Sequence, residues 1–165
     1  MFIFLIILII VMAIPIYLGF RSLFEYRHPK NIYKVVKDAF TRIIKKQKLS
    51  IAEINLFGNR LIAIDSKLKK LVLIQYKHGI VWENCLNLRK MAFCRIAKTT
   101  NMVSGETQKV NLELLTFGKG RTIIFPFFDE KVDVIHDLPA RIKSAQYWKG
   151  KVQYEINTAQ LTNAR

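Results

Sequence analysis

Residues 51–83 read IAEINLFGNRLIAIDSKLKKLVLIQYKHGIVWE, and this stretch decides the fold. Its apolar side chains follow a period of two, which is typical of strands whose two faces meet different surroundings. Turn signals interrupt the pattern at Gly58-Asn59, at SKLKK and at His78-Gly79. The stretch therefore predicts four antiparallel strands joined by tight hairpins, at residues 51–57, 60–65, 70–76 and 80–83.

Three further strands are predicted downstream of this stretch. Residues 91–97 read MAFCRIA and predict a long fifth strand, and a polar loop follows at residues 101–106. A sixth strand is expected at residues 110–114 and a seventh at residues 122–128, with Gly118-Lys119-Gly120 as the hairpin turn between them. Seven strands in meander order favour a small antiparallel barrel.

A C-terminal helix is predicted over residues 134–154. Acidic side chains gather at its start, where a helix favours negative charge and a capping residue, so we interpret them as capping groups rather than as a cation site. These are Asp129, Glu130, Asp133 and Asp137. An apolar stripe from Leu138 to Val152 includes Trp148 and is expected to close one corner of the barrel. Residues 155–165 are expected to be a frayed tail.

Residues 29–48 predict a basic amphipathic helix upstream of the barrel. Apolar residues from Ile32 to Ile44 share one face at helical spacing, and lysines lie largely on the opposite side. Two interpretations stay open for the apolar face. It can lie along lipid headgroups, or it can cover the following domain while the lysines are only solvated.

Residues 1–20 contain no charged side chain, whereas residues 21–48 carry nine Lys or Arg against two acids. An apolar helix of about 20 residues is just long enough to cross a bilayer, and basic residues collect on its cytoplasmic side. A cleaved signal peptide would have a charged start and a shorter apolar run. The sequence thus predicts a single-pass protein of the bacterial inner membrane, with the N-terminus outside and residues 21–165 in the cytoplasm. The expected organisation is a transmembrane helix (1–20), a juxtamembrane helix (21–49), a barrel domain (50–154) and the tail (155–165).

The net charge of +15 is spread over the whole part that follows residue 20, with +7 in residues 21–48 and +8 in residues 49–165. Such basicity favours anionic partners, namely acidic lipid, nucleic acid or an acidic protein surface. A single-strand binder is expected to expose aromatic residues among its basic ones. The FPFF run at residues 125–128 is better explained as core and turn, which argues against nucleic acid.

The sequence carries no pattern that predicts catalysis, a cofactor or a metal. Cys85 and Cys94 are the two cysteines and do not have the spacing of a zinc site, and the three histidines are scattered singly. No nucleophile motif, P-loop or dinucleotide fingerprint is present. We therefore predict a non-enzymatic protein without a cofactor or a metal.

Three segments resemble membrane-anchored bacterial proteins that have a pleckstrin-homology-like domain. These segments are IAIDSKLKKLVLI, GKGRTIIFPFFDEKVD and KSAQYWKGKV, and the resemblance covers about residues 50–154. It implies an α+β fold, a seven-stranded antiparallel barrel capped by a C-terminal helix, and a binding role without catalysis. Domains of that family hold phosphorylated headgroups with basic residues near an early hairpin.

The candidate binding residues are lysines of the predicted hairpins and of the predicted amphipathic helix. They are Lys67, Lys69, Lys70, Lys77, Lys34, Lys37, Lys45 and Lys46. The predicted function is a membrane-anchored interaction module that docks a protein partner or anionic lipid at the cytoplasmic face of the membrane. The alternative is a small accessory subunit of a larger inner-membrane complex. Turn lysines that only keep a hairpin soluble are the simpler explanation of the hairpin set.

Overall fold

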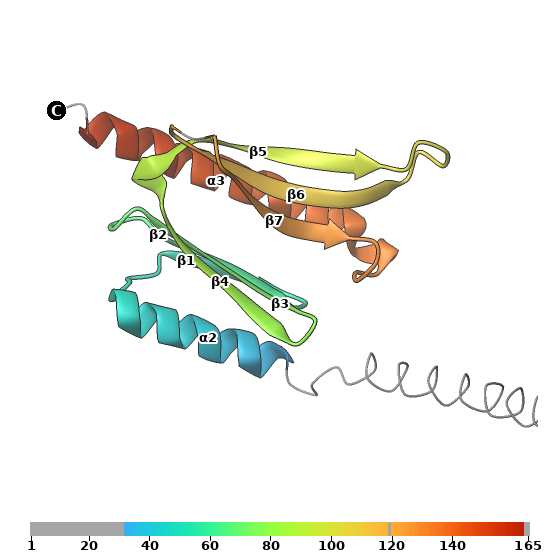
Figure 1. Cartoon of the computed structure of the whole chain (residues 1–165), viewed down its shortest axis with the longest axis horizontal. Coiled ribbons are helices and arrows are strands. Elements are labelled where there is room, and N and C mark those ends of the chain that lie inside the picture. Colours follow the sequence, from blue (N-terminus) through green and yellow to red (C-terminus); the bar gives the residue numbers. More distant parts are fainter. Residues whose placement is uncertain (1–31, 119, 164–165) are drawn as a thin grey trace, which may run out of the picture.

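The computed structural model describes residues 32–118 and 120–163, which form two antiparallel sheets and two long helices (Figure 1). The four-stranded sheet has the order β1 (Glu53–Phe57), β2 (Arg60–Asp65), β3 (Lys70–Lys77) and β4 (Ile80–Asn87). The three-stranded sheet has the order β5 (Met91–Thr100), β6 (Thr107–Thr116) and β7 (Thr122–Asp129). Helix α2 (Ile32–Gln47) comes first and α3 (Leu138–Asn163) last, and the short 3-10 turns are η1 (Leu88–Lys90) and η2 (Ile135–Asp137).

The hairpin turns have the chemistry that the sequence predicts. His78 and Gly79 join β3 to β4 with φ angles of 51° and 80°. Two consecutive positive φ angles are the mark of a two-residue turn whose twist matches that of the flanking strands, and glycine adopts them without steric cost. The register of β3 and β4 continues up to this turn, because Lys77 lies opposite Ile80.

The main core lies between the two sheets and α3. Leu71 and Leu73 of β3 meet Leu112 of β6 and the indole of Trp148, which is only 1% exposed. The apolar stripe of α3 continues through Ile156 and Ala159, which are both fully buried. Because this burial extends the helix contact with the core, α3 runs to Asn163 and includes most of the segment that was expected to be a frayed tail.

A second, smaller core lies between α2 and the outer face of the four-stranded sheet. Val36, Ala39 and Ile43 of α2 pack there against Val72 and Ile74 of β3. This packing explains why β2 has no alternation: its residues are buried on both faces of the sheet. The apolar face of α2 therefore covers the domain, as the second interpretation of this helix expected.

The predicted single barrel needs correction, because the seven strands form two separate sheets. β4 pairs only with β3, and β5 pairs only with β6. The 3-10 turn η1 lies between β4 and β5 and interrupts the ladder at this corner. A meander pattern in the sequence indicates which strands follow one another, but it does not indicate where a ladder stops.

The predicted transmembrane helix, residues 1–20, lies outside the described residues. Among the helices of residues 32–118 and 120–163, none is long and apolar enough to cross a membrane. α2 has 16 residues, and the longer α3 carries four basic side chains and one acidic one, which are costly to place in lipid. No described helix therefore supports the transmembrane part of the predicted fold, the single-pass topology or the inner-membrane localisation, and we correct these predictions on this finding.

Candidate functional site

One end of the two sheets gathers basic side chains, and we name it the basic end. It consists of residues 45–50 at the C-terminal end of α2, the β2–β3 turn at residues 66–70, η1, and the β6–β7 turn at residues 117–121. Three backbone N–H groups join these segments: Ser50 donates to Asp65 Oδ2 at 2.6 Å, Leu88 to Lys69 O at 2.8 Å, and Phe117 to Lys90 O at 3.1 Å. Segments that are far apart in the sequence thus form one continuous surface.

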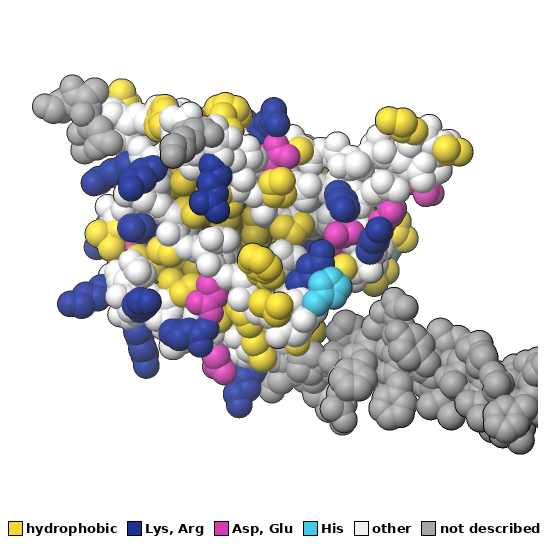
Figure 2. Space-filling view, in the orientation of Figure 1, with side chains coloured by type: hydrophobic (Ala, Val, Ile, Leu, Met, Phe, Trp, Pro, Cys, Tyr) yellow, Lys and Arg dark blue, Asp and Glu magenta, His cyan; other side chains and the backbone are white. Residues whose placement is uncertain are grey.

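The described residues of the basic end include nine cations and no acid. They are Lys45, Lys46, Lys48, Lys67, Lys69, Lys70, Arg89, Lys90 and Arg121. The blue side chains of Figure 2 gather accordingly at the left of the view. Two neighbouring carboxylates, Asp65 and Glu155, touch these segments and are already engaged. Asp65 accepts hydrogen bonds from the backbone N–H groups of Ser50 and Leu68, and Glu155 pairs with Lys69.

Lys69 is a structural cation rather than a free one. Its Nζ lies 2.6 Å from Glu155 Oε2 and 2.9 Å from Thr158 Oγ1, so it ties the β2–β3 turn to α3. Burial of Glu155 by itself raises the pKa of this carboxyl group. Hydrogen bonds from Lys69 and Ser66, with the charges of Lys69 and Lys151, outweigh burial and lower the pKa below its usual 4.5.

A pocket of about 660 Å³ opens between β4, η1 and the β6–β7 turn. Lys70, Arg89 and Lys90 line it, and no acidic residue does. None of these three cations forms an ion pair among the described residues. Unpaired cations around a hollow favour an anionic ligand.

Two of these turns carry exposed apolar side chains. Leu68 lies in the β2–β3 turn beside Lys67 and is 47% exposed, and Phe117 lies in the β6–β7 turn and is 56% exposed. Lysine flanked by exposed apolar residues is the composition of surfaces that sit at a lipid–water interface.

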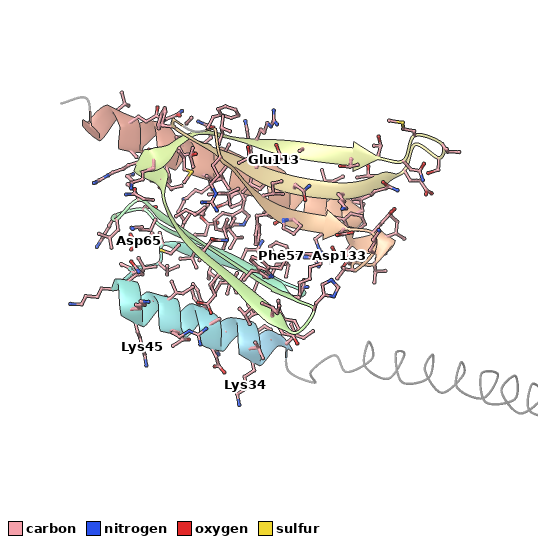
Figure 3. The ribbon with its side chains drawn as sticks, in the orientation of Figure 1. Lys34, Lys45, Phe57, Asp65, Glu113 and Asp133 are labelled. Atoms are coloured by element: carbon pink, nitrogen blue, oxygen red, sulfur yellow. The ribbon has the colours of Figure 1, made fainter. Side chains whose placement is uncertain are left out.

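The lysines that the sequence predicts as binding residues do not all lie together in the structure. Lys67, Lys69 and Lys70 lie at the basic end, where Lys45 and Lys46 join them from α2. Lys77 lies at the other end of β3, next to the β3–β4 turn. Figure 3 shows Lys34 and Lys45 toward opposite ends of α2, with Lys45 on the same side as Asp65.

Sequence reasoning missed Arg89 and Lys90. Both follow Leu88, whose side chain is fully buried and which begins the 3-10 turn. The Asn87 side chain caps this turn by accepting a hydrogen bond from the backbone N–H of Arg89. The run Asn-Leu-Arg-Lys at residues 87–90 was the available signal, since a capping residue before an apolar anchor favours a turn that exposes the two residues after it.

The end of the sheets that is remote from these residues, which we name the paired end, has a balanced charge. It consists of the turns at residues 58–60 and 77–80 and the loop at residues 129–137, which together carry three cations and four acids. Arg60 is 1% exposed, and its Nη1 lies 2.9 Å from both carboxylate oxygens of Asp133. The loop before α3 is thereby held against β2.

The two thiols have little nucleophilic character. Burial raises the pKa of Cys94 to about 11, and burial likewise raises the pKa of Cys85. Both cysteines are free. Within the described residues, no group of three or more His, Cys, Asp or Glu side chains could hold a metal ion.

Comparison with protein-family models found no match, and searches of curated proteins and of solved structures found none either. The resemblance to pleckstrin-homology-like proteins therefore stays a prediction.

Proposed function

We propose that this protein is a non-enzymatic interaction module that docks its basic end onto an anionic lipid surface. One observation carries the proposal: nine cations from four segments share one surface, and none of these four segments contains an acidic residue. Of these nine, only Lys69 forms an ion pair among the described residues. The others keep their charge available for an external anion.

The expected electrostatic attraction is sufficient for reversible docking. Each Lys or Arg near an anionic membrane contributes about 1 kcal/mol, and the attraction decays within a Debye length of about 8 Å at physiological salt. The exposed side chains of Leu68 and Phe117 add apolar contact at the same surface. The positive charge draws the basic end to the membrane, and the side chains of Leu68 and Phe117 limit the orientation in which it docks.

Catalysis has no support from the arrangement of the titratable groups. The raised pKa values leave both thiols neutral near pH 7. The buried acid Glu155 is engaged by Lys69, and Asp133 is engaged by Arg60. An interaction role uses the basic end without requiring any of these groups to react.

A vesicle-binding measurement tests the proposal with two matched variants of the full-length chain. The first replaces Lys70, Arg89 and Lys90 by Gln at the basic end. The second replaces Lys77, Lys98 and Lys131 by Gln, three exposed lysines outside the basic end. Both variants lose three positive charges and keep residues 1–20, so a difference between them reports only where the charge lies.

We expect the first variant to bind vesicles of phosphatidylcholine and phosphatidylserine about 100-fold more weakly than the unmodified chain, which corresponds to about 1 kcal/mol per charge. The second variant should change little, because an eight-residue strand such as β3 separates the ends by about 26 Å. Equal losses in the two variants, or no preference of the unmodified chain for anionic vesicles, would overturn the proposal.

A further inference from the structure

The outer face of the four-stranded sheet is wider than the helix that covers it. Strands lie about 4.8 Å apart and a helix is about 10 Å across, so one helix covers about two strands. α2 lies over β3 and β4. The described part of the chain therefore supplies no second helix for the β1 side of this face.

A groove of about 470 Å³ occupies the uncovered strip between α2 and β1. Leu56 and Leu61 lie at its floor, together with Ile54, which is 48% exposed. Phe40 and Ile44 form the wall on α2. An exposed isoleucine beside half-buried aromatic and aliphatic side chains indicates an apolar surface that another element can cover.

The length of the groove suits a helix. Its lining residues on α2 extend from Tyr33 to Lys45, which are 12 residues apart and so span about 18 Å at 1.5 Å per residue. This corresponds to about three turns of a second helix lying alongside α2. Leucine-type side chains at helical spacing would then meet the strip formed by Ile54 and Leu56.

The charge of the groove indicates what kind of helix fits. Lys37 and Lys45 line it, and no acidic residue does. Neither lysine forms an ion pair among the described residues. Two cations that flank an apolar strip favour an occupant with an apolar face and acidic margins.

The helices of a second copy of this chain do not have this chemistry. Both helices of the described part are basic: α2 carries five Lys or Arg against one acid, and α3 carries four against one. Placing either beside α2 would bring like charges together, which disfavours the contact. Residues 1–20 carry no charge and would leave Lys37 and Lys45 without a partner.

We propose that this groove docks an acidic amphipathic helix of a partner protein, which lies beside α2 and completes the outer helical layer over β1. The groove shares only Lys45 with the basic end, and its proposed role goes beyond docking on lipid. It gives the chain a surface for a protein while the basic end meets the membrane.

A designed peptide tests the proposal on the full-length chain. The probe is a fluorescein-labelled peptide of about 18 residues, long enough to form a helix, with Leu at helical spacing and Glu at the flanking positions. One control peptide has the same composition in scrambled order, and another has Lys in place of Glu. Fluorescence anisotropy gives the affinities. A photo-reactive group on the apolar face of the probe identifies the residues that it touches.

Two pairs of protein variants locate the contact. Ile54→Glu is matched by Ile124→Glu on β7, because Ile124 is 58% exposed and lies outside the groove. The pair Lys37→Gln and Lys45→Gln is matched by the pair Lys98→Gln and Lys131→Gln. We expect Ile54→Glu to weaken binding of the acidic probe about tenfold or more, and the groove lysine pair to weaken it about fivefold. The matched controls should leave binding unchanged.

The result that supports the proposal is preferential binding of the patterned acidic probe, with cross-links to α2 and β1. Equal binding of the scrambled peptide, equal loss in Ile124→Glu, or cross-links confined to other elements would overturn it. It would also be overturned if the chain forms dimers that Ile54→Glu dissociates, because a second copy would then be the occupant.

Discussion

The two ends of the sheets contain similar side chains and use them in opposite ways. At the paired end, Arg60 is buried and its Nη1 contacts both carboxylate oxygens of Asp133, so this ion pair holds a loop in place. At the basic end, Lys70, Arg89 and Lys90 surround a pocket without any carboxylate among its lining residues. A paired, buried charge contributes to the folded structure, whereas an unpaired charge at the surface remains available for a partner. The comparison indicates that net charge alone does not locate a binding surface.

The largest expected effect is at the paired end. Asp133→Ala leaves the guanidinium of Arg60 buried without its counter-charge, and the loss of one partner of a buried pair costs about 3–5 kcal/mol. Urea unfolding of the variant measures this change in the free energy of unfolding. Glu130→Ala is the matched control in the same loop, because Glu130 is exposed, and it should change stability by less than about 0.5 kcal/mol. Similar effects of the two substitutions would mean that the paired end does not depend on this contact.

The next largest effect on stability distinguishes two lysines of the β2–β3 turn. Lys69→Met removes the partner of Glu155 and should lower the free energy of unfolding by about 2 kcal/mol, the usual scale for a hydrogen bond to a charged group. Lys67→Met, at an exposed position two residues earlier, should stay within about 0.5 kcal/mol of the unmodified chain. Chemical denaturation of the two variants measures these changes. Equal losses in the free energy of unfolding would contradict the prediction.

The cost of Lys69→Met should also depend on pH. The pKa of Glu155 is lowered in the folded chain, so its contribution is fully present above its unfolded value of about 4.5 and is lost as pH falls through the folded pKa. The difference between the unmodified chain and the variant should therefore shrink as the pH is lowered below this range. A difference that stays constant down to low pH would assign the effect to lost packing of the lysine stem instead.

The smallest expected effect is on stability at the basic end. Arg89→Ala together with Lys90→Ala removes two exposed cations that have no ion-pair partner among the described residues, so the free energy of unfolding should change by less than about 0.5 kcal/mol. Thermal unfolding of this double variant checks the prediction. A loss comparable to that of Asp133→Ala would mean that these residues hold the corner between the sheets, and it would remove the contrast between the two ends.

Local sequence patterns located most of the elements because their causes are local. The period of two and the His78-Gly79 turn place β3 and β4, since turn chemistry and alternation act over a few residues. The stripe that contains Trp148 marks α3, but its end was placed too early because the burial of Ile156 and Ala159 depends on the distant sheets. The interruption between β4 and β5 likewise depends on three-dimensional packing at η1.

The candidate site was only partly accessible from the sequence. Lys67, Lys69 and Lys70 are adjacent in the chain and were expected to share a surface. Lys77 follows in the same hairpin, yet a strand of eight residues carries it to the other end of the molecule. The run at residues 87–90 indicates only that Arg89 and Lys90 are exposed, and the contact of η1 with the two turns places them at the basic end.

The sequence by itself determined the order of the strands, the turns that join them, the amphipathic faces of both helices and the strongly basic character of the chain. These properties follow from side-chain type and spacing, which act within a few residues. Only the tertiary structure decided that the strands divide into two sheets, that α2 covers one half of an outer face, and which cations are paired. Those outcomes depend on contacts between distant segments, where burial and the position of each carboxylate decide whether a charge supports the fold or remains free to meet a partner.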